Sequence, residues 1–212
     1  MAIETAASDP CAELVAARRD LLALIETLDP QDWDKSTLCD GWRVRDVVAH
    51  VAQLPDLRGL KLLPRVLKAR GSVAKVRDEA ARKEGQHDPA EIVEHLRSSL
   101  ECDQLRLGAS VDRALVDTVI HSLDICYPHG WELHLPADRA RRVLSILVEL
   151  GDPLGGKARA ESLHLDTTDI DWRCGHGHHV RGPAPVMLLA LAGRPVCDQL
   201  TGEGVPVLAQ RG

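Results

Sequence analysis

The sequence predicts a mainly α-helical protein that ends in a small mixed α/β part. Three observations support this fold class. Apolar residues recur at steps of three and four through most of the first 150 residues, which is the period of one helix face. With four Trp, one Tyr and no Phe, the core must be built from aliphatic residues and Ala, and Leu and Ala are good helix formers. A Gly- and Pro-rich cluster at 151–156 then precedes a stretch with strand-like alternation.

The first predicted helix begins at Ser8-Asp9-Pro10, which combines a capping side chain with a proline in the first turn. Asp29-Pro30 ends it. A second helix is expected from Val44, and Pro55 interrupts or kinks it. The apolar stripes of the two helices are Leu14, Ala17, Leu21, Leu24 and Leu28 in the first, and Val44, Val47, Val48, Val51 and Leu54 in the second.

The middle of the chain continues the helical pattern. Residues 57–83 are basic but keep a helical apolar period, and residues 85–89 form a predicted turn. A third helix is expected over about 89–107 and a fourth over about 112–127. Pro136 is then expected to open a fifth helix.

The C-terminal part of the chain has a different sequence pattern. Residues 163–167 alternate between apolar and polar positions, which predicts a strand. Residues 172–181 are predicted to form the return strand. A short apolar helix follows over Val186 to Leu191, and Gly193 ends it.

Composition and charge give a domain plan and exclude some functions. Because Gly151 opens the cluster of helix breakers, we expect a helical domain over 1–150 and a small α/β domain over 151–212. The formal net charge is −6, from 26 Lys+Arg and 32 Asp+Glu, which argues against nucleic-acid binding. Too few aromatic residues are present for base stacking. No apolar run approaches 18 residues, so no membrane span is expected.

The cysteines and the N-terminal residues indicate a cytoplasmic protein. The chain has six Cys, none of them in a Cys-x-x-Cys pair, and it is large enough not to need disulfide staples. Reduced thiols are therefore expected. The first residues lack the basic start and apolar run of a secretory signal. The oligomeric state stays open, with a homodimer as a mild expectation.

One candidate metal site lies on the predicted fourth helix. Asp117 and His121 are four residues apart and therefore lie side by side on a helix, with Asp124 in the same arc. A carboxylate and an imidazole at this spacing can ligate one divalent metal. The same pattern is also typical of a solvated polar face, which Arg113 would share.

Other candidates also have two interpretations. His50 lies at the edge of its helix's apolar face, where a half-buried, hydrogen-bonded core histidine is more common than a ligand. The Cys174–His179 cluster could bind metal or contact substrate, or could be an exposed hairpin turn. Cys39 could lie near a metal, although a free buried thiol is the more common case. The basic run 57–83 could attract an anionic substrate or a membrane surface, or simply be solvated.

Three segments carry a resemblance to a known family. Residues 39–50 read CDGWRVRDVVAH, residues 121–125 read HSLDI, and an apolar helix near 184–191 ends in Gly193-Arg194. Together they resemble the mycothiol-dependent maleylpyruvate isomerase family, within the wider DinB/YfiT-like superfamily of metalloenzymes.

The resemblance implies a DinB-like four-helix bundle followed by a small α/β C-terminal domain. The bundle of this family holds one divalent ion, usually zinc, and its ligands carry over to His50, Asp117 and His121. The family more often has Glu at the acid position, so Asp117 is one methylene shorter. The family's C-terminal domain also supplies a catalytic Arg, which would be Arg194. The other interpretation of Arg194 is a helix C-terminal cation that interacts with the helix dipole.

The resemblance further implies mycothiol, the low-molecular-weight thiol of actinobacteria, as cosubstrate. A metal-held thiolate would attack a small electrophilic substrate, which makes the protein a thiol S-transferase or a cis–trans isomerase. Arg194 would bind a substrate carboxylate or stabilise developing negative charge. One alternative is hydrolysis by metal-bound water. The other is a non-catalytic bundle that binds a small ligand or a protein partner.

Overall fold

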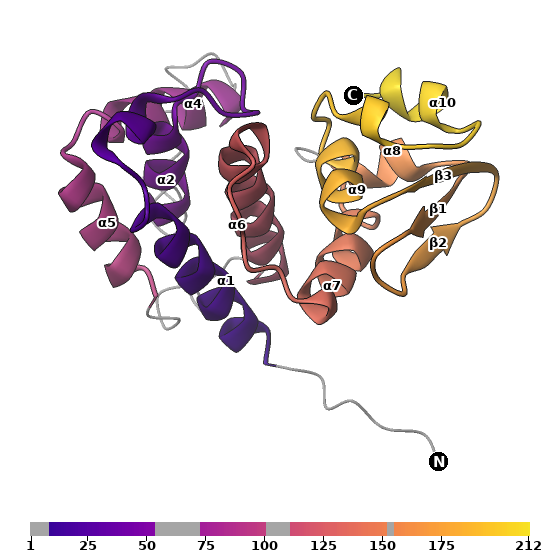
Figure 1. Ribbon diagram of the computed structural model, residues 1–212, viewed down its shortest axis with the longest axis horizontal. Helices are drawn as coiled ribbons and strands as arrows, with labels where there is room; N and C mark the ends of the chain where they lie inside the picture. The colour runs from indigo at the N-terminus through magenta and orange to yellow at the C-terminus, as the bar shows by residue number, and fades with distance from the viewer. Residues whose placement is uncertain (1–8, 54–72, 101–110, 152–154) are drawn as a thin grey trace.

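The computed structural model describes residues 9–53, 73–100, 111–151 and 155–212, and it confirms the mainly α fold with a small α/β part (Figure 1). Helix α6 (Val111–Cys126) lies between two groups of elements. One group contains α1 (Pro10–Ile25), α2 (Val44–Gln53), α4 (Val73–Glu84) and α5 (Pro89–Ser98). The other contains α7 (Ala137–Leu147), α8 (Gly156–Ala160), α9 (Ala184–Leu191), α10 (Val205–Ala209) and a three-stranded sheet.

The first helix begins where the sequence predicts. The Asp9 side chain accepts from the backbone N–H of Cys11 at 3.1 Å, and Pro10 occupies the first turn. Helix α1 ends at Ile25, before the predicted end, because a turn there leads into a short 3-10 helix over Pro30–Asp34.

The third predicted helix is shorter than expected. Helix α5 ends at Ser98, and the Ser99 hydroxyl donates to the Leu96 carbonyl at 2.7 Å. That bond offers the backbone an alternative to further helical bonding. The remainder of the predicted helix, the Pro55 kink and the basic residues 57–72 lie outside the described residues.

Helix α6 is buried around its whole circumference from Ala114 to Cys126. It packs against α1 and α2 on one side and against α7 and α9 on the other. The interpretation of its polar arc as a solvated face is therefore wrong. The arc faces neighbouring helices, so its charged groups need partners inside the protein.

The predicted return strand is two strands in the structure. Strand β1 (Leu163–Thr167) is central, with β2 (Arg173–Gly175) antiparallel on one edge and β3 (His178–Gly182) parallel on the other. The chain crosses from one edge to the other at Gly177, where φ is +123° and a Cβ atom would lie 2.1 Å from the Ser162 carbonyl oxygen. Only glycine fits there, so the strand breaks. Helix α9 and its end before Gly193 are confirmed.

The two groups share one apolar core, built mainly from Leu, Val, Ile and Ala. Buried Trp172 joins the sheet region to α7, because its indole N–H donates to the Ser145 hydroxyl at 3.0 Å. None of the described helices has the length and apolar character needed to cross a membrane.

The expectation that every thiol is reduced is wrong for Cys11, which is disulfide-bonded. Spacing along the chain does not show which cysteines meet in space. Four other cysteines are free thiols: Cys39, Cys126, Cys174 and Cys197.

Candidate metal centre

The three predicted ligands come together in the interior. His50 lies near the end of α2, while Asp117 and His121 lie one turn apart on α6, and all three are less than 9% exposed. The Oδ2 atom of Asp117 is 3.4 Å from Nε2 of His50, and its Oδ1 atom is 3.8 Å from Nε2 of His121. One donor atom from each residue lies within 4.8 Å of the other two.

Local sequence explains how α2 presents its histidine. Val44, Val47, Val48 and Val51 are fully buried, so they fix which face of α2 turns inward, and α2 packs against α6. His50 lies next to this face and is turned inward with it. On α6 the spacing of four residues sets the two other ligands side by side.

Unpartnered polar atoms mark this cluster as suited to a cation. In the part of the chain that the structure describes, buried Nδ1 of His50 and Oδ2 of Asp117 have no hydrogen-bond partner. Buried polar atoms are nearly always hydrogen-bonded, so such orphans call for an explanation. Two imidazoles and one carboxylate form a donor set that zinc and related divalent ions accept. The residues present therefore fit the metal that the resemblance implies.

The second ring nitrogen of His121 faces away from this cluster. Its Nδ1 atom lies 3.0 Å from Oδ2 of Asp124, and the Cys39 thiol donates to the same oxygen at 3.0 Å. Asp124 is completely buried. Such a carboxylate behind a histidine ligand is a common second layer of metal sites.

Charge balance determines the protonation of His121. Burial lowers the pKa of His121, but the charge of Asp117 and hydrogen bonds with Asp124 and Cys39 raise it to about 10. Burial raises the pKa of Asp117, but the charge of His121 and the contact with His50 hold it well below its ordinary value. Burial mainly lowers the pKa of His50. Without a metal, the proton on His121 therefore supplies the positive charge of the cluster.

Arg194 reaches the centre through Asp124. Its guanidinium donates from Nε to Oδ1 at 2.8 Å and from Nη2 to Oδ2 at 2.7 Å, which is a bidentate pair. Its Nη1 donates to the carbonyl of Ala192, the C-cap residue of α9. Arg194 therefore interacts with the C-terminal end of α9, as the helix-end interpretation expects, and also contacts Asp124 at the candidate site. Sequence reasoning placed Asp124 on the ligand arc but gave it no role.

The Trp42 ring packs against the two histidines of the candidate site. Its ring centroid is 5.1 Å from that of His50 and 6.0 Å from that of His121. Its indole N–H donates to the Asp78 carboxylate on α4 at 2.6 Å, which fastens α4 to the site.

Arg77, next to Asp78 on α4, is a cation that sequence reasoning did not single out. It is half-buried, and its charge contributes to the lowered pKa values of His50 and Asp117. Among the described residues it has no hydrogen bond and no ion pair with another side chain. Its only signal in the sequence was membership of the basic run 57–83.

The Cys174–His179 cluster lies elsewhere. It spans β2, the crossing to β3 and the start of β3, and its histidines are exposed. Within the described ranges, none of its residues belongs to a group of three close metal-donor atoms. It is not a hairpin turn, because its two strands pair with opposite edges of β1.

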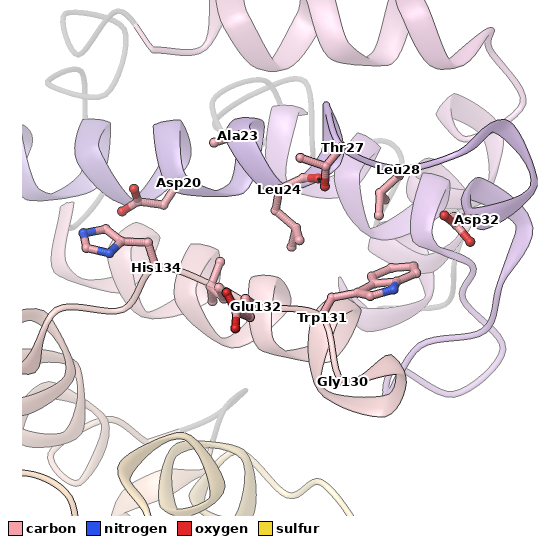
Figure 2. Close-up of a pocket in the computed structure, with 11 residues that line it drawn as sticks. Asp20, Ala23, Leu24, Thr27, Leu28, Asp32, Gly130, Trp131, Glu132 and His134 are labelled. Carbon is pink, nitrogen blue, oxygen red and sulfur yellow. Dashed lines mark hydrogen bonds between the residues drawn. The ribbon is translucent and has the colours of Figure 1, made fainter.

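Two hollows lie near α6 in the described part of the chain, and neither is lined by the candidate ligands. A groove of about 870 Å³ lies between α1 and the segment after α6. Figure 2 shows Asp20 and His134 toward one end of it and Asp32 and Trp131 toward the other. A second cavity of about 470 Å³ lies between α6 and the start of α9. Neither is lined by His50, Asp117 or His121, so we place the chemistry at the donor set and not in these hollows.

Comparisons with known proteins support the fold. Residues 14–102 match the family model of the mycothiol maleylpyruvate isomerase N-terminal domain. Two solved structures, of the mycothiol-dependent maleylpyruvate isomerase and of a variant with one histidine changed to alanine, share the fold with a TM-score of 0.61. Each is 14% identical, and the match covers 92% of this chain and 91% of that one. No curated protein gave a significant match.

Proposed function

This chain resembles the mycothiol maleylpyruvate isomerase family in its N-terminal sequence and its fold, and on that premise we propose that it is a metal-dependent enzyme. It would use a low-molecular-weight thiol, mycothiol, to attack a small electrophilic substrate. One observation carries the proposal: His50, Asp117 and His121 form a buried donor set with unpartnered polar atoms. Burying polar atoms without partners is costly, and buried titratable groups with strongly shifted pKa values are typical of functional sites.

The proposed ligands are His50, Asp117 and His121, and zinc is the metal that suits them. When bound, a divalent ion at this site lowers the pKa of a thiol, so that the thiolate is present at neutral pH. Three protein ligands leave room for a further group, which distinguishes a catalytic from a structural site. The protein's own task is to hold these three side chains in place and to restrict water around them.

Two arginines take different tasks in this proposal. Arg194 is engaged with Asp124 and acts on the ligand set through that carboxylate. Arg77 is close enough to lower the pKa of Asp117 and has no partner among the described side chains, so it is a cation available to a substrate carboxylate.

The reaction has two outcomes that differ in the fate of the thiol. In both, the sulfur electron pair forms a carbon–sulfur bond at the electrophilic carbon. If the adduct takes up a proton or expels a leaving group and is released, the enzyme is an S-transferase. If the adduct turns about its former double bond and the carbon–sulfur bond breaks again, the enzyme is a cis–trans isomerase and the thiol is regenerated.

Metal content is the first test. Protein purified without an affinity tag from cells grown with zinc should contain about one metal per chain by elemental analysis. The His50→Ala variant should lose the metal, because the two remaining ligands hold it only weakly. His176→Ala is the matched control, since this exposed histidine lies in the β2–β3 crossing, and it should retain the metal. Metal-free wild-type protein would contradict the enzyme proposal.

Adduct formation is the second test. Metal-loaded protein is incubated with mycothiol and a panel of electrophiles, with and without a carboxylate, and products are followed by mass spectrometry. Thiol adducts support the transferase, while isomerised substrate of unchanged mass supports the isomerase. Arg77→Gln should raise KM for the carboxylate-bearing electrophiles and leave the others unchanged.

A further inference from the structure

Asp124 is a meeting point for three separate parts of the chain. Its carboxylate accepts from His121 on its own helix, from the Cys39 thiol and from the Arg194 guanidinium, at 2.7 to 3.0 Å. Its backbone carbonyl also accepts from the N–H of Leu38 at 3.1 Å. The side chain is fully buried, so these donors replace water completely.

We propose that Asp124 is a positioning residue that orients His121 as a ligand, and that Arg194 holds Asp124 in place for this task. The inference rests on the metal site proposed above. It gives the C-terminal part of the chain a role in metal binding although none of its residues belongs to the ligand set.

The orientation of the imidazole ring supports this role. The two ring nitrogens of His121 face two different carboxylates, with Nδ1 3.0 Å from Asp124 and Nε2 3.8 Å from Asp117. A hydrogen on Nδ1, donated to Asp124, leaves the Nε2 lone pair on the side of His50 and Asp117. The Cys39 sulfur also lies 3.5 Å from Nδ1, but a thiol sulfur is a weak acceptor, so the Asp124 carboxylate is the main group that selects this tautomer.

Arg194 supplies the restraint on Asp124. A bidentate pair fixes both the position and the plane of a carboxylate. The Arg194 side chain is only 17% exposed, so water screens this pair weakly. The guanidinium is in turn held by the Ala192 carbonyl, which places it at the end of α9.

Asp124→Asn is the first test, because it keeps the shape of the side chain but has one acceptor oxygen instead of two. That oxygen cannot serve both sides of the network. Zinc affinity, measured by competition with a chelating indicator, should fall by about 10- to 100-fold. The absorption spectrum of the cobalt-loaded protein should also change, because the spectrum reports how the imidazole is oriented.

Asp46→Asn is the matched control. Asp46 is also a buried aspartate, but it pairs with Arg43 at the start of α2. This variant should lose stability and keep both the zinc affinity and the cobalt spectrum of the wild type.

Arg194→Gln keeps Asp124 and should give a smaller loss of zinc affinity in the same direction. If Asp124→Asn does not fold, Arg194→Gln decides, and an affinity within about twofold of wild type overturns the proposal. If Asp124→Asn binds zinc like the wild type with an unchanged spectrum, the positioning role alone is wrong. Wild-type protein that binds no zinc overturns both this inference and the proposed function.

Discussion

At the residue scale, the charge of each group in the candidate centre depends on its few charged neighbours, because water is excluded there. Asp117, Asp124 and His121 are all at least nine-tenths buried, and each stabilises the charged form of a neighbour. The positive charge that balances Asp117 is the proton on His121. A divalent ion would compete with that proton for the same nitrogen. Both the acid at position 117 and the solution pH should therefore control metal binding.

The acid at position 117 can be tested by two substitutions. Asp117→Asn removes the charge and should leave most chains metal-free by elemental analysis. Asp117→Glu keeps a carboxylate and should retain the metal, because Oδ2 of Asp117 is not fastened by another hydrogen bond among the described residues. An Asp117→Asn variant that keeps the full metal content would show that residue 117 is not a ligand.

Metal affinity should rise with pH. The pKa of His121 is raised to about 10 in the metal-free protein, so His121 is protonated below that value and must release a proton to bind metal. His50 has a lowered pKa and binds without releasing one at neutral pH. The affinity for zinc should therefore increase by up to about tenfold per pH unit between roughly pH 7 and 9. Calorimetry in two buffers of different ionisation enthalpy should count about one proton released, and a pH-independent affinity would contradict this expectation.

At the element scale, α6 and the β2–β3 crossing differ from what their sequence periodicity predicts. Helix α6 is polar on one arc and still buried, because that arc meets α2 and the loop around Cys39. The crossing needs a backbone shape that only glycine adopts without a clash. In both cases the element is determined by its neighbours and not by its own periodicity.

Replacing Gly177 should disrupt the sheet. Gly177→Ala should lower the free energy of unfolding by about 2–4 kcal/mol, because the new Cβ meets the Ser162 carbonyl at a positive φ. Gly130→Ala is the control: φ there is +65°, but no atom lies within 4 Å of the added Cβ, so a loss of about 1 kcal/mol is expected. Urea unfolding measures both, and equal losses would show that the contact with Ser162 is unimportant.

At the scale of the whole molecule, the candidate centre joins parts of the chain that are far apart in sequence. His50 comes from α2, Asp117 and His121 from α6, and Arg194 adds the C-terminal part through Asp124. A metal that binds only the folded chain must therefore stabilise the whole fold. The predicted division near Gly151 stays a prediction, since α7 contacts both α6 and α9.

Metal removal should lower the stability of the protein. At a free zinc concentration about 100 times Kd, the free energy of unfolding should rise by about 2.7 kcal/mol. For a chain of this length the melting temperature should rise by roughly 5–10 °C. A chelator should reverse the change, and His50→Ala should show none. A melting temperature unaffected by zinc in the wild type would mean that the folded protein does not bind it at this site.

Features that depend on near neighbours along the chain can be predicted from the sequence alone. Helix starts follow from caps such as Asp9 and from prolines, and the spacing of four between Asp117 and His121 places them side by side on any helix. The motif at residues 39–50 points to His50 as a candidate ligand only through the family resemblance. These signals are local, so they can be recognised before the chain is folded.

What these residues face depends on how distant parts of the chain pack together. Asp124 meets Arg194 across 70 positions of the chain and Cys39 across 85, and no local pattern encodes such pairs. The polar arc of α6 has the same sequence pattern whether it faces water or α2. Burial removes water from that arc and makes each charge depend on its protein partners. That loss of water, which depends on how all the helices pack, turns three ordinary polar residues into a candidate metal centre.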